Sequence, residues 1–205
     1  MIDNGNLSNT FLKVTFMSPV ISPPFVAGNL ALDFINTLFG AGSDQHECLD
    51  DDSSVVRWLV QAGALTDDLE SPPSGLLLLG RALREEMRML VISAKDGQAA
   101  STELVNRVLE RGRPLERIEW QPAKGVFEKR MYRRNLESES LLQPVAQALV
   151  RLLTEENLRL VKECEACDCV LLFHDQTKSH RRRWCSMASC GNRMKAIAFR
   201  ARRKR

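Results

Sequence analysis

The sequence predicts a mainly α-helical protein with one small β-hairpin, followed by a small C-terminal module of two short strands and a basic helix. Three observations lead to this prediction. Apolar residues recur at three- and four-residue spacing along most of the first 157 residues, as they do on the buried face of amphipathic helices. One central stretch instead places a turn between two runs of strand-forming residues. Five of the six cysteines lie within 27 residues near the C-terminal end.

The N-terminal part is expected to start with an irregular arm over residues 1–24, which contain three prolines and no sustained apolar period. A first helix is predicted over residues 29–40, where leucine, phenylalanine and isoleucine recur at helical spacing. After an acidic loop, Ser53 or Ser54 is the expected N-cap of a short helix that ends at Gly63.

Two long helices and the hairpin follow. Residues 75–94 have the strongest helical period in the chain, and a shorter helix is predicted over residues 101–110. Residues 115–132 surround the turn Gln-Pro-Ala-Lys-Gly with aromatic and branched side chains, which is typical of a hairpin. The second long helix is expected over residues 140–157, where Pro144 is tolerated because it falls near the first turn.

Charge divides the chain more sharply than the net value of +3 indicates. Residues 176–205 contain eleven Lys and Arg and no Asp or Glu, which leaves 18 of the 29 basic residues against all 26 acidic ones elsewhere. The C-terminal segment is therefore +11 and the remainder −8. A local cationic surface of this size favours a nucleic acid as partner.

The clustered cysteines predict a metal site rather than disulfides, because a reducing cytoplasm keeps thiols free. Cys185 and Cys190 form the second pair, about 20 residues after the first. In the first pair Cys164 is joined by Cys167 in a C-x2-C spacing or by Cys169 in a C-x4-C spacing, and spacing alone slightly favours Cys167. Four thiolates fill a tetrahedral zinc site and leave no open position for a substrate, so the zinc is expected to be structural.

Two segments resemble known families. The run RRWCSMASCGNR at residues 182–193, followed by Lys195, closely resembles the signature of the CGNR zinc-finger family. The run GNLALDFINTL at residues 28–38, together with residues 49–59, resembles the ABATE domain that accompanies this finger. After the irregular arm at 1–24, the resemblance implies an ABATE-like helical regulatory domain at 25–157 and a CGNR-type finger at 158–205.

The same resemblance implies a ligand set. In the family pattern a phenylalanine follows the second cysteine by four residues and an aspartate lies two further on, a frame that Cys169, Phe173 and Asp175 match here. One structural Zn²⁺ would then be held by Cys164, Cys169, Cys185 and Cys190, with Cys167 as the alternative to Cys169.

A basic helix is predicted from Asn192 toward the end of the chain. Arginine donates two hydrogen bonds at once to phosphate and to guanine edges, so this helix suits duplex DNA. The candidate nucleic-acid-binding residues share a basic or amide side chain in or beside the finger: Lys178, Arg181, Arg182, Arg183, Asn192, Arg193, Lys195, Arg200, Arg202 and Arg203. One or more arginines among residues 181–183 and Arg193 are expected to brace the finger instead, by bonding Asp175, Asp168 or backbone carbonyls.

Three residues outside these sets carry a prediction of their own. Asp33 and Asn36 interrupt an apolar helix and are expected to hydrogen-bond neighbouring loops rather than to line a pocket. Trp184 is expected in the finger's small core rather than as a platform for bases.

The sequence therefore predicts a zinc-dependent, DNA-binding transcription regulator of the bacterial cytoplasm, whose stress-response regulatory domain binds a small-molecule or protein effector, with homodimer formation as an option. An RNA-binding zinc ribbon and a protein-interaction scaffold are the alternatives. No membrane partner is expected, since no apolar run reaches the length of a membrane span. An enzyme is not expected, because phosphate-binding glycine loops, nucleophile elbows and metalloprotease helices are absent from the sequence.

Overall fold

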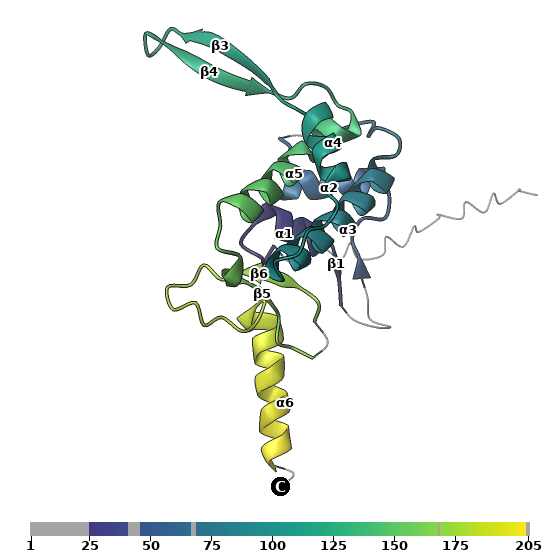
Figure 1. Cartoon of the computed structure of the whole chain (residues 1–205), viewed down its shortest axis with the longest axis vertical. Coiled ribbons are helices and arrows are strands. Elements are labelled where there is room, and N and C mark those ends of the chain that lie inside the picture. The colour runs from purple at the N-terminus through teal and green to yellow at the C-terminus, as the bar shows by residue number, and fades with distance from the viewer. Residues whose placement is uncertain (1–24, 41–45, 67–68, 168, 204–205) are drawn as a thin grey trace, which may run out of the picture.

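A computed structural model describes residues 25–40, 46–66, 69–167 and 169–203 of the chain. The predicted N-terminal arm lies outside these residues. Figure 1 shows a helical body in the middle, a long β-hairpin leaving it at one end and a single helix leaving it at the other. The mainly α-helical class predicted from the sequence is confirmed.

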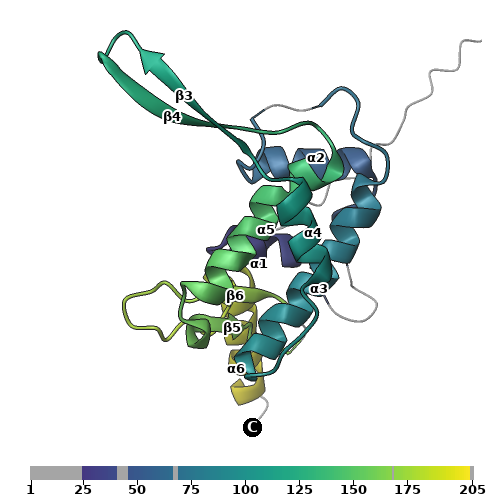
Figure 2. The ribbon, with the colours of Figure 1, turned by 45° about the horizontal axis from the view of Figure 1, so that its top comes forward.

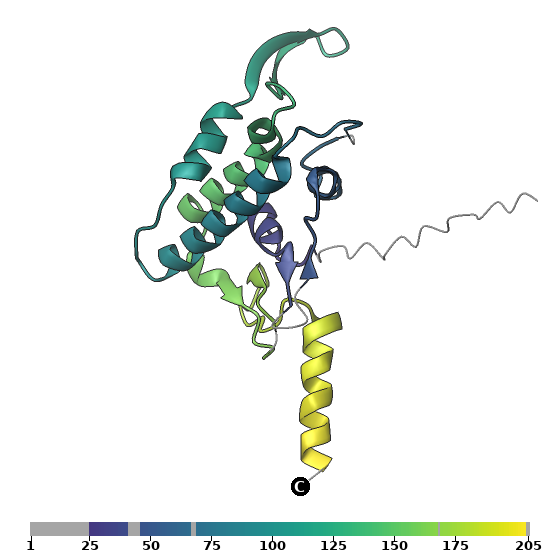
Figure 3. The ribbon, with the colours of Figure 1, turned by 90° about the vertical axis from the view of Figure 1, so that its right-hand side faces the viewer.

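Five helices build the body. Their bounds are α1 Leu30–Ile35, α2 Asp52–Gln61, α3 Leu76–Lys95, α4 Glu103–Arg111 and α5 Ser138–Thr154. Helices α3, α4 and α5 lie side by side, and α1 packs against α3 and α5 (Figure 3). The predicted apolar faces meet in one core, in which Phe34, Leu83, Met87 and Leu149 are fully buried. Helix α4 can approach α5 closely at Gly112, where a Cβ would lie 2.3 Å from the carbonyl oxygen of Glu139.

The first helix is shorter than expected. It ends at Ile35 rather than near Gly40, and Leu38–Phe39 form strand β1, which pairs with β2 (His46–Glu47). The Thr37 side chain turns back and donates a hydrogen bond of 2.8 Å to a carbonyl in the last turn of the helix. The sequence predicts a longer helix because the apolar residues of β1 continue the three- and four-residue spacing of α1.

Helix α2 is capped by Asp51, not by Ser53 or Ser54. The Asp51 carboxylate accepts from the Ser54 amide at 2.6 Å, while the Ser54 hydroxyl accepts from the Asp51 amide at 3.0 Å. This reciprocal pair is a capping box, in which the serine occupies the third helical position. Asp52 accepts from the Leu77 amide at 2.6 Å and so joins the start of α2 to the start of α3.

Helix α5 begins two residues before the predicted Ser140, which moves Pro144 into its second turn. A proline there cannot bond the carbonyl four residues earlier. Arg133 supplies the missing donor, because its Nη1 lies 2.6 Å from the Ser140 carbonyl oxygen and its Nη2 lies 3.0 Å from that of Ala64. The prediction that Pro144 lies near the first turn is therefore wrong, and the role of Arg133 is not visible in the sequence.

The central hairpin is confirmed. Strands β3 (Leu115–Gln121) and β4 (Val126–Tyr132) pair in antiparallel register around a turn that contains Gly125 at a φ of +64°. The hairpin projects from the body near α4 and α5 (Figures 1 and 2). No residue of either strand belongs to the buried core.

The C-terminal segment continues from α5 into a small module. Its elements are a 3-10 turn η2 (Leu158–Leu160), strands β5 (Val161–Glu163) and β6 (Leu172–His174), a π-helical turn η3 (Met187–Gly191) and helix α6 (Asn192–Arg203). The sequence predicts a strand from Leu158, but residues 158–160 form the 3-10 turn and the strand begins at Val161. The module packs on the body, because its buried residues join the same core. None of the helices in the described ranges is long and apolar enough to cross a membrane.

Candidate metal centre and nucleic-acid surface

Four cysteine sulfurs meet at the junction of the two strands and the π-helical turn. Cys164 follows β5, and Cys169 precedes β6. Cys185 lies just before η3, and Cys190 lies within it. Their four sulfurs all lie within 4.8 Å of one another, and three of the four side chains are buried. No other such group of potential metal ligands occurs among the described residues.

The spacing of the sulfurs suits zinc. In a tetrahedron with Zn–S bonds of about 2.3 Å, neighbouring sulfurs lie about 3.8 Å apart. The Cys169 and Cys185 sulfurs are 3.8 Å apart, and those of Cys185 and Cys190 are 3.6 Å apart. The four cysteines therefore fit one structural zinc ion.

Two donors outside the thiols point at the sulfurs. The backbone amide of Cys185 donates to the Cys164 sulfur at 3.3 Å, and Nη2 of Arg193 lies 3.5 Å from the Cys190 sulfur. Such donors stabilise thiolates over thiols, as metal ligation requires. Arg193, proposed from the sequence to contact nucleic acid, thus also lies beside the metal centre.

The pKa values show why the cluster needs a cation. A hydrogen bond from the Cys185 thiol lowers the pKa of Cys169 to about 5. The pKa of Cys185 itself is raised far above its ordinary value, because it holds the proton shared with Cys169 and is buried beside it. Burial raises the pKa of Cys190 to about 11. Several thiolates at this spacing repel one another, so only a dication makes the fully ionised cluster stable.

Cys167, the alternative ligand, is exposed and lies outside the four-sulfur cluster. The backbone amide of Cys169 bonds the carbonyl of Ala166 at 3.0 Å, which folds the loop so that Cys169 is carried toward Cys185. Residue spacing alone favoured Cys167, and the family pattern favoured Cys169.

Asp175 organises the loop between the cysteine pairs. Its carboxylate is fully buried and accepts from the Lys162 ammonium at 2.6 Å, the Thr177 hydroxyl at 2.6 Å and the Arg182 amide at 2.9 Å. Burial alone would raise the pKa of Asp175, but these donors hold it well below its ordinary value. The ionised carboxylate of Asp175 therefore binds both ends of the loop that carries Lys178 and Arg181.

Arg182 braces the finger against the body. Its guanidinium donates to the carbonyls of Trp184 at 2.9 Å, Val26 at 2.8 Å and Cys185, and it stacks over the Phe173 ring at 4.3 Å. The expectation that an arginine of 181–183 serves the protein's own structure is thus met at Arg182.

Asn36 holds strand β6 to the body. Its Nδ2 donates to the Leu172 carbonyl at 2.8 Å, and its Oδ1 accepts from the Leu172 amide at 3.0 Å. The side chain thereby takes the place of a neighbouring strand. Asp33 accepts from the Ala27 amide at 2.9 Å, and burial raises the pKa of this carboxyl to about 6. Both residues bond neighbouring segments, as expected, rather than lining a pocket.

Trp184 packs half-buried against the core of the finger, as expected, and Arg183 covers its ring at 4.8 Å. Gly191, the glycine of the CGNR run, lies beneath it. A Cβ at this position would lie 2.6 Å from the Met187 sulfur and 3.1 Å from Cδ1 of Trp184, so only glycine fits without rearrangement.

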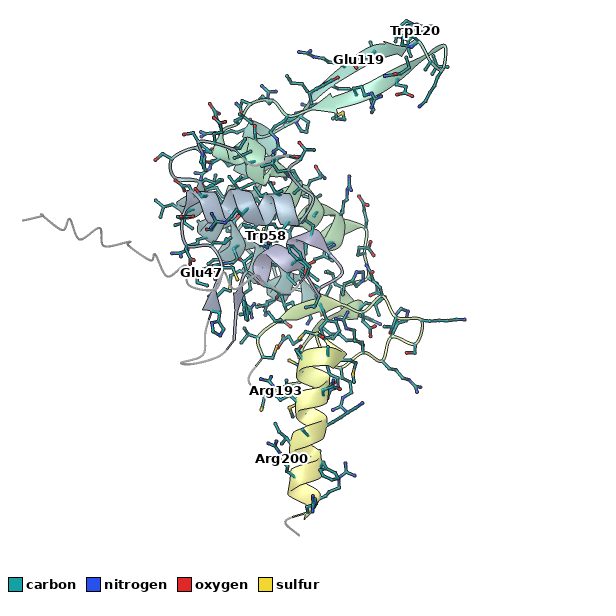
Figure 4. All side chains as sticks on the ribbon, turned by 180° about the vertical axis from the view of Figure 1, so that it is seen from behind. Glu47, Trp58, Glu119, Trp120, Arg193 and Arg200 are labelled. Carbon is teal, nitrogen blue, oxygen red and sulfur yellow. The ribbon has the colours of Figure 1, made fainter. Side chains whose placement is uncertain are left out.

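Beyond its start, helix α6 extends away from the other described elements (Figures 1 and 3). It contains no buried residue, and only Met194 is half-buried near its start. Figure 4 shows Arg193 near its beginning and Arg200 farther along it. The large apolar side chains of this helix are therefore largely uncovered, with Ile197 and Phe199 exposed.

The remaining candidate residues fall into two groups. Lys178 and Arg181 are exposed on the loop, and Arg183 forms an exposed ion pair with Glu165 at 2.6 Å. The others lie on α6 and are exposed: Asn192, Arg193, Lys195, Arg200, Arg202 and Arg203. Asn192 is the first residue of α6 rather than a separate cap, because the π-helical turn runs directly into the helix.

The fold and the cysteine cluster define a helical protein that carries a C-terminal zinc finger. A model of the ABATE family, described as "Putative stress-induced transcription regulator", matches residues 28–156, and the CGNR zinc-finger model matches residues 160–203. The chain belongs to the ABATE family and ends in a CGNR zinc finger, as the resemblance predicted. Neither description names an enzymatic activity. No curated protein matches the chain.

Proposed function

We propose that this protein is a zinc-dependent, DNA-binding transcription regulator of the cytoplasm, in which the finger binds duplex DNA and the helical body modulates that binding. The zinc ion, held by Cys164, Cys169, Cys185 and Cys190, has a structural role. It fixes the start of α6 relative to the rest of the finger and takes part in no covalent chemistry.

The observation that carries the proposal is the placement of α6. The helix begins two residues after the fourth cysteine, extends away from the body and bears five Lys and Arg without an acidic residue. At about 1.5 Å per residue its twelve residues span about 18 Å, enough to cross a major groove about 12 Å wide. A rigidly anchored basic helix of this length can enter the groove end-on or lie along the phosphates.

The contact surface is proposed to comprise two parts. The helix supplies Arg193, Lys195, Arg200, Arg202 and Arg203, and the loop supplies Lys178, Arg181 and Arg183. Asn192 lies at the start of the helix, where its amide can reach a phosphate or a base edge. Arg182 is given a positioning role in this proposal, because its guanidinium already donates to three carbonyls.

The charge of the body supports a division of labour. Residues before 176 carry a net charge of −8 and are repelled by phosphates, so they are suited to bind an effector rather than DNA. An open groove with a volume of about 1190 Å³ at the base of the hairpin includes Arg113, Arg134 and Arg151 in its lining, and it is a place where a small molecule can act on the body.

Competition binding tests the proposal. The zinc-loaded full chain is bound to a labelled duplex at moderate salt, and unlabelled duplex DNA, single-stranded DNA and structured RNA are compared as competitors. Duplex DNA is expected to compete best. If about six phosphates are engaged, affinity should fall by about three orders of magnitude between 50 and 200 mM salt.

A pair of charge variants supplies the control. Arg200→Gln with Arg203→Gln should weaken binding to all duplexes and reduce the salt slope by about two. Arg57→Gln with Arg107→Gln removes the same charge from exposed sites on α2 and α4 and should leave affinity unchanged. Preferential competition by RNA would make the protein an RNA-binding zinc ribbon instead. Equal affinity in both variants would favour a protein-interaction scaffold.

A further inference from the structure

The hairpin has two faces of different character. Its register pairs Glu116 with Met131, Ile118 with Lys129 and Trp120 with Phe127, and directly opposed residues share a face. Four of these six side chains are apolar, and we call the surface they form the arm face. The opposite face is polar, apart from Leu115 and Val126 at its ends, and holds the ion pair of Arg130 with Glu128.

The arm face is uncovered. Ile118 is 73% exposed, Phe127 66%, Met131 55% and Trp120 51%. Figure 4 shows Trp120 near the far end of the hairpin, away from the helices. With roughly 200 Å² for a side chain of this size, the four leave on the order of 500 Å² of apolar surface in contact with water. This area matches the largest apolar patch on a typical monomer, and patches of this size often serve an interaction.

Within the described part of the chain, the hairpin also lacks an apolar layer that would stabilise it. A two-stranded hairpin alone is marginally stable in water and needs a covered apolar face. Its strands contribute nothing to the buried core, and the contact between Trp120 and Phe127, with ring centroids 5.1 Å apart, lies within the arm face itself. Packing of the arm face against a partner would supply the missing cover.

We propose that two copies of this chain associate through the arm face, each hairpin packing its apolar side against that of the other. The inference goes beyond the proposed DNA binding and does not depend on it. The two hairpins form one apolar contact of four strands in two layers, and Trp120 and Phe127 lie at its centre.

Charge and area favour a second copy as the partner. The arm face carries one acid and one base, Glu116 and Lys129, which lie 3.5 Å apart within a hairpin and can pair equally well between two hairpins. It is therefore neutral and self-complementary, as a two-fold interface requires. Two such faces contain about 1,000 Å² of apolar surface, which with a polar rim reaches the lower end of the 1,200–2,000 Å² buried in specific interfaces.

The position of the hairpin also favours association of two copies through the arm face. The hairpin leaves the body at the end opposite α6 (Figure 1), so association there keeps the two +11 segments apart. Both fingers would remain exposed, with their basic helices directed away from the contact. A dimer closed through the fingers would instead have to overcome the mutual repulsion of these segments.

Sedimentation equilibrium of the zinc-loaded full chain tests the proposal, in roughly 0.5 M salt to screen the charge of the finger. The mass is expected to rise with concentration from 23.2 kDa to twice that value. Ile118→Ser with Phe127→Ser should raise the dissociation constant at least about ten-fold, because the substitutions remove two apolar contacts of the interface. Val126→Ser is the matched control, since Val126 is 46% exposed on the same hairpin but on its opposite face, and it should leave the constant unchanged.

Unchanged zinc content and helical signal establish that the variants fold, as expected for residues outside the core. A wild-type protein that stays at 23.2 kDa at all concentrations overturns the proposal, as does a dimer equally strong in the arm-face variant. If the wild type is monomeric and the arm-face variant loses affinity for single-stranded RNA, the aromatic pair stacks on bases and the proposal is equally overturned.

Discussion

Asn36 joins the body to the finger through two side-chain hydrogen bonds. Both polar groups of its side chain are used by Leu172, and the side chain is completely buried. Strand β6 has β5 on one side, so the amide of Asn36 provides the hydrogen bonds that the other side requires. The cysteine that precedes this strand is thereby fixed relative to α1.

Asn36→Ala is expected to lower the free energy of unfolding by about 2–4 kcal/mol, because it leaves a buried amide and a buried carbonyl without partners. Urea unfolding of the zinc-loaded protein measures the loss. Gln176→Ala removes a single, exposed hydrogen bond to the Gly28 carbonyl and should cost less than about 1 kcal/mol. Equal effects of the two substitutions would show that Asn36 has no special role at this junction.

Glu47 and Arg84 make the most buried ion pair in the described part of the body. Both guanidinium Nη atoms lie 2.7 Å from carboxylate oxygens, and Arg84 also donates to the Thr37 hydroxyl at 3.0 Å. Burial alone would raise the pKa of Glu47, but the hydrogen bonds and charge of Arg84 lower it below its ordinary value of 4.5.

This pair predicts a pH dependence with a definite sign. A carboxyl whose pKa is lower in the folded state stabilises the fold above its ordinary pKa and loses that contribution as the pH falls through the lower folded value. Glu47→Gln should therefore cost roughly 2–4 kcal/mol at pH 7 and progressively less below pH 4.5. Unfolding free energies measured across this range check the prediction, and a pH-independent difference would contradict it.

The sequence identified individual residues well where chemistry restricts the choice. Cysteines at metal-binding spacing and a basic run beside them need no tertiary knowledge to be recognised. Arg182 and Asn36 were harder to assign, because an exposed arginine and one that bonds three carbonyls look alike in a sequence. Only the fold brings Val26 and Leu172 to within hydrogen-bond distance of these side chains.

At the scale of elements, α6 is the one α-helix among the described residues that contains no buried residue. Helices of fewer than about 12–15 residues are marginal in water unless an apolar face is packed, and α6 has twelve residues with none buried. Its anchored start, through Cys190 and Met194, provides the nucleus from which the helix extends. The rest of the helix gains little from tertiary contacts.

We therefore expect the amides of residues 197–203 to exchange rapidly in the free protein and to become protected when duplex DNA binds. Hydrogen–deuterium exchange with mass spectrometry measures both states. Helix α3, which is packed along its length, is the internal control and should not change. Protection of α6 that is the same with and without DNA would indicate that the helix does not contact the duplex.

Long periodic helices were predictable because three or more turns of apolar residues leave little ambiguity. The sequence predictions were wrong at the ends of elements, because side-chain hydrogen bonds determine where a helix stops or continues. Helix α1 stops because Asn36 and Thr37 turn their side chains to other partners, and α5 continues across Pro144 because Arg133 satisfies a carbonyl. The solvent exposure of the hairpin's apolar residues also lay beyond the sequence, since the same alternation suits a strand packed on a core.

At the scale of the whole molecule, finger and body share one hydrophobic core and several hydrogen bonds. The Ala27 carbonyl accepts from the His174 amide at 2.7 Å, and the Arg182 brace reaches Val26 from the finger. A change at the body can therefore reach the metal centre through packed residues rather than through a flexible linker. Under the proposed function, this continuity would let the helical body alter the affinity of the finger for DNA.

The most direct test follows zinc content and duplex affinity together while a chelator is added to the wild-type protein. About one zinc per chain is expected at the start, and affinity should fall in step with the zinc and return when zinc is restored. Cys185→Ser should behave as the stripped protein, whereas Cys167→Ser should keep both metal and affinity. Stripped protein that binds duplex DNA as tightly as the zinc-loaded form would contradict the proposal that the zinc centre builds the DNA-binding surface.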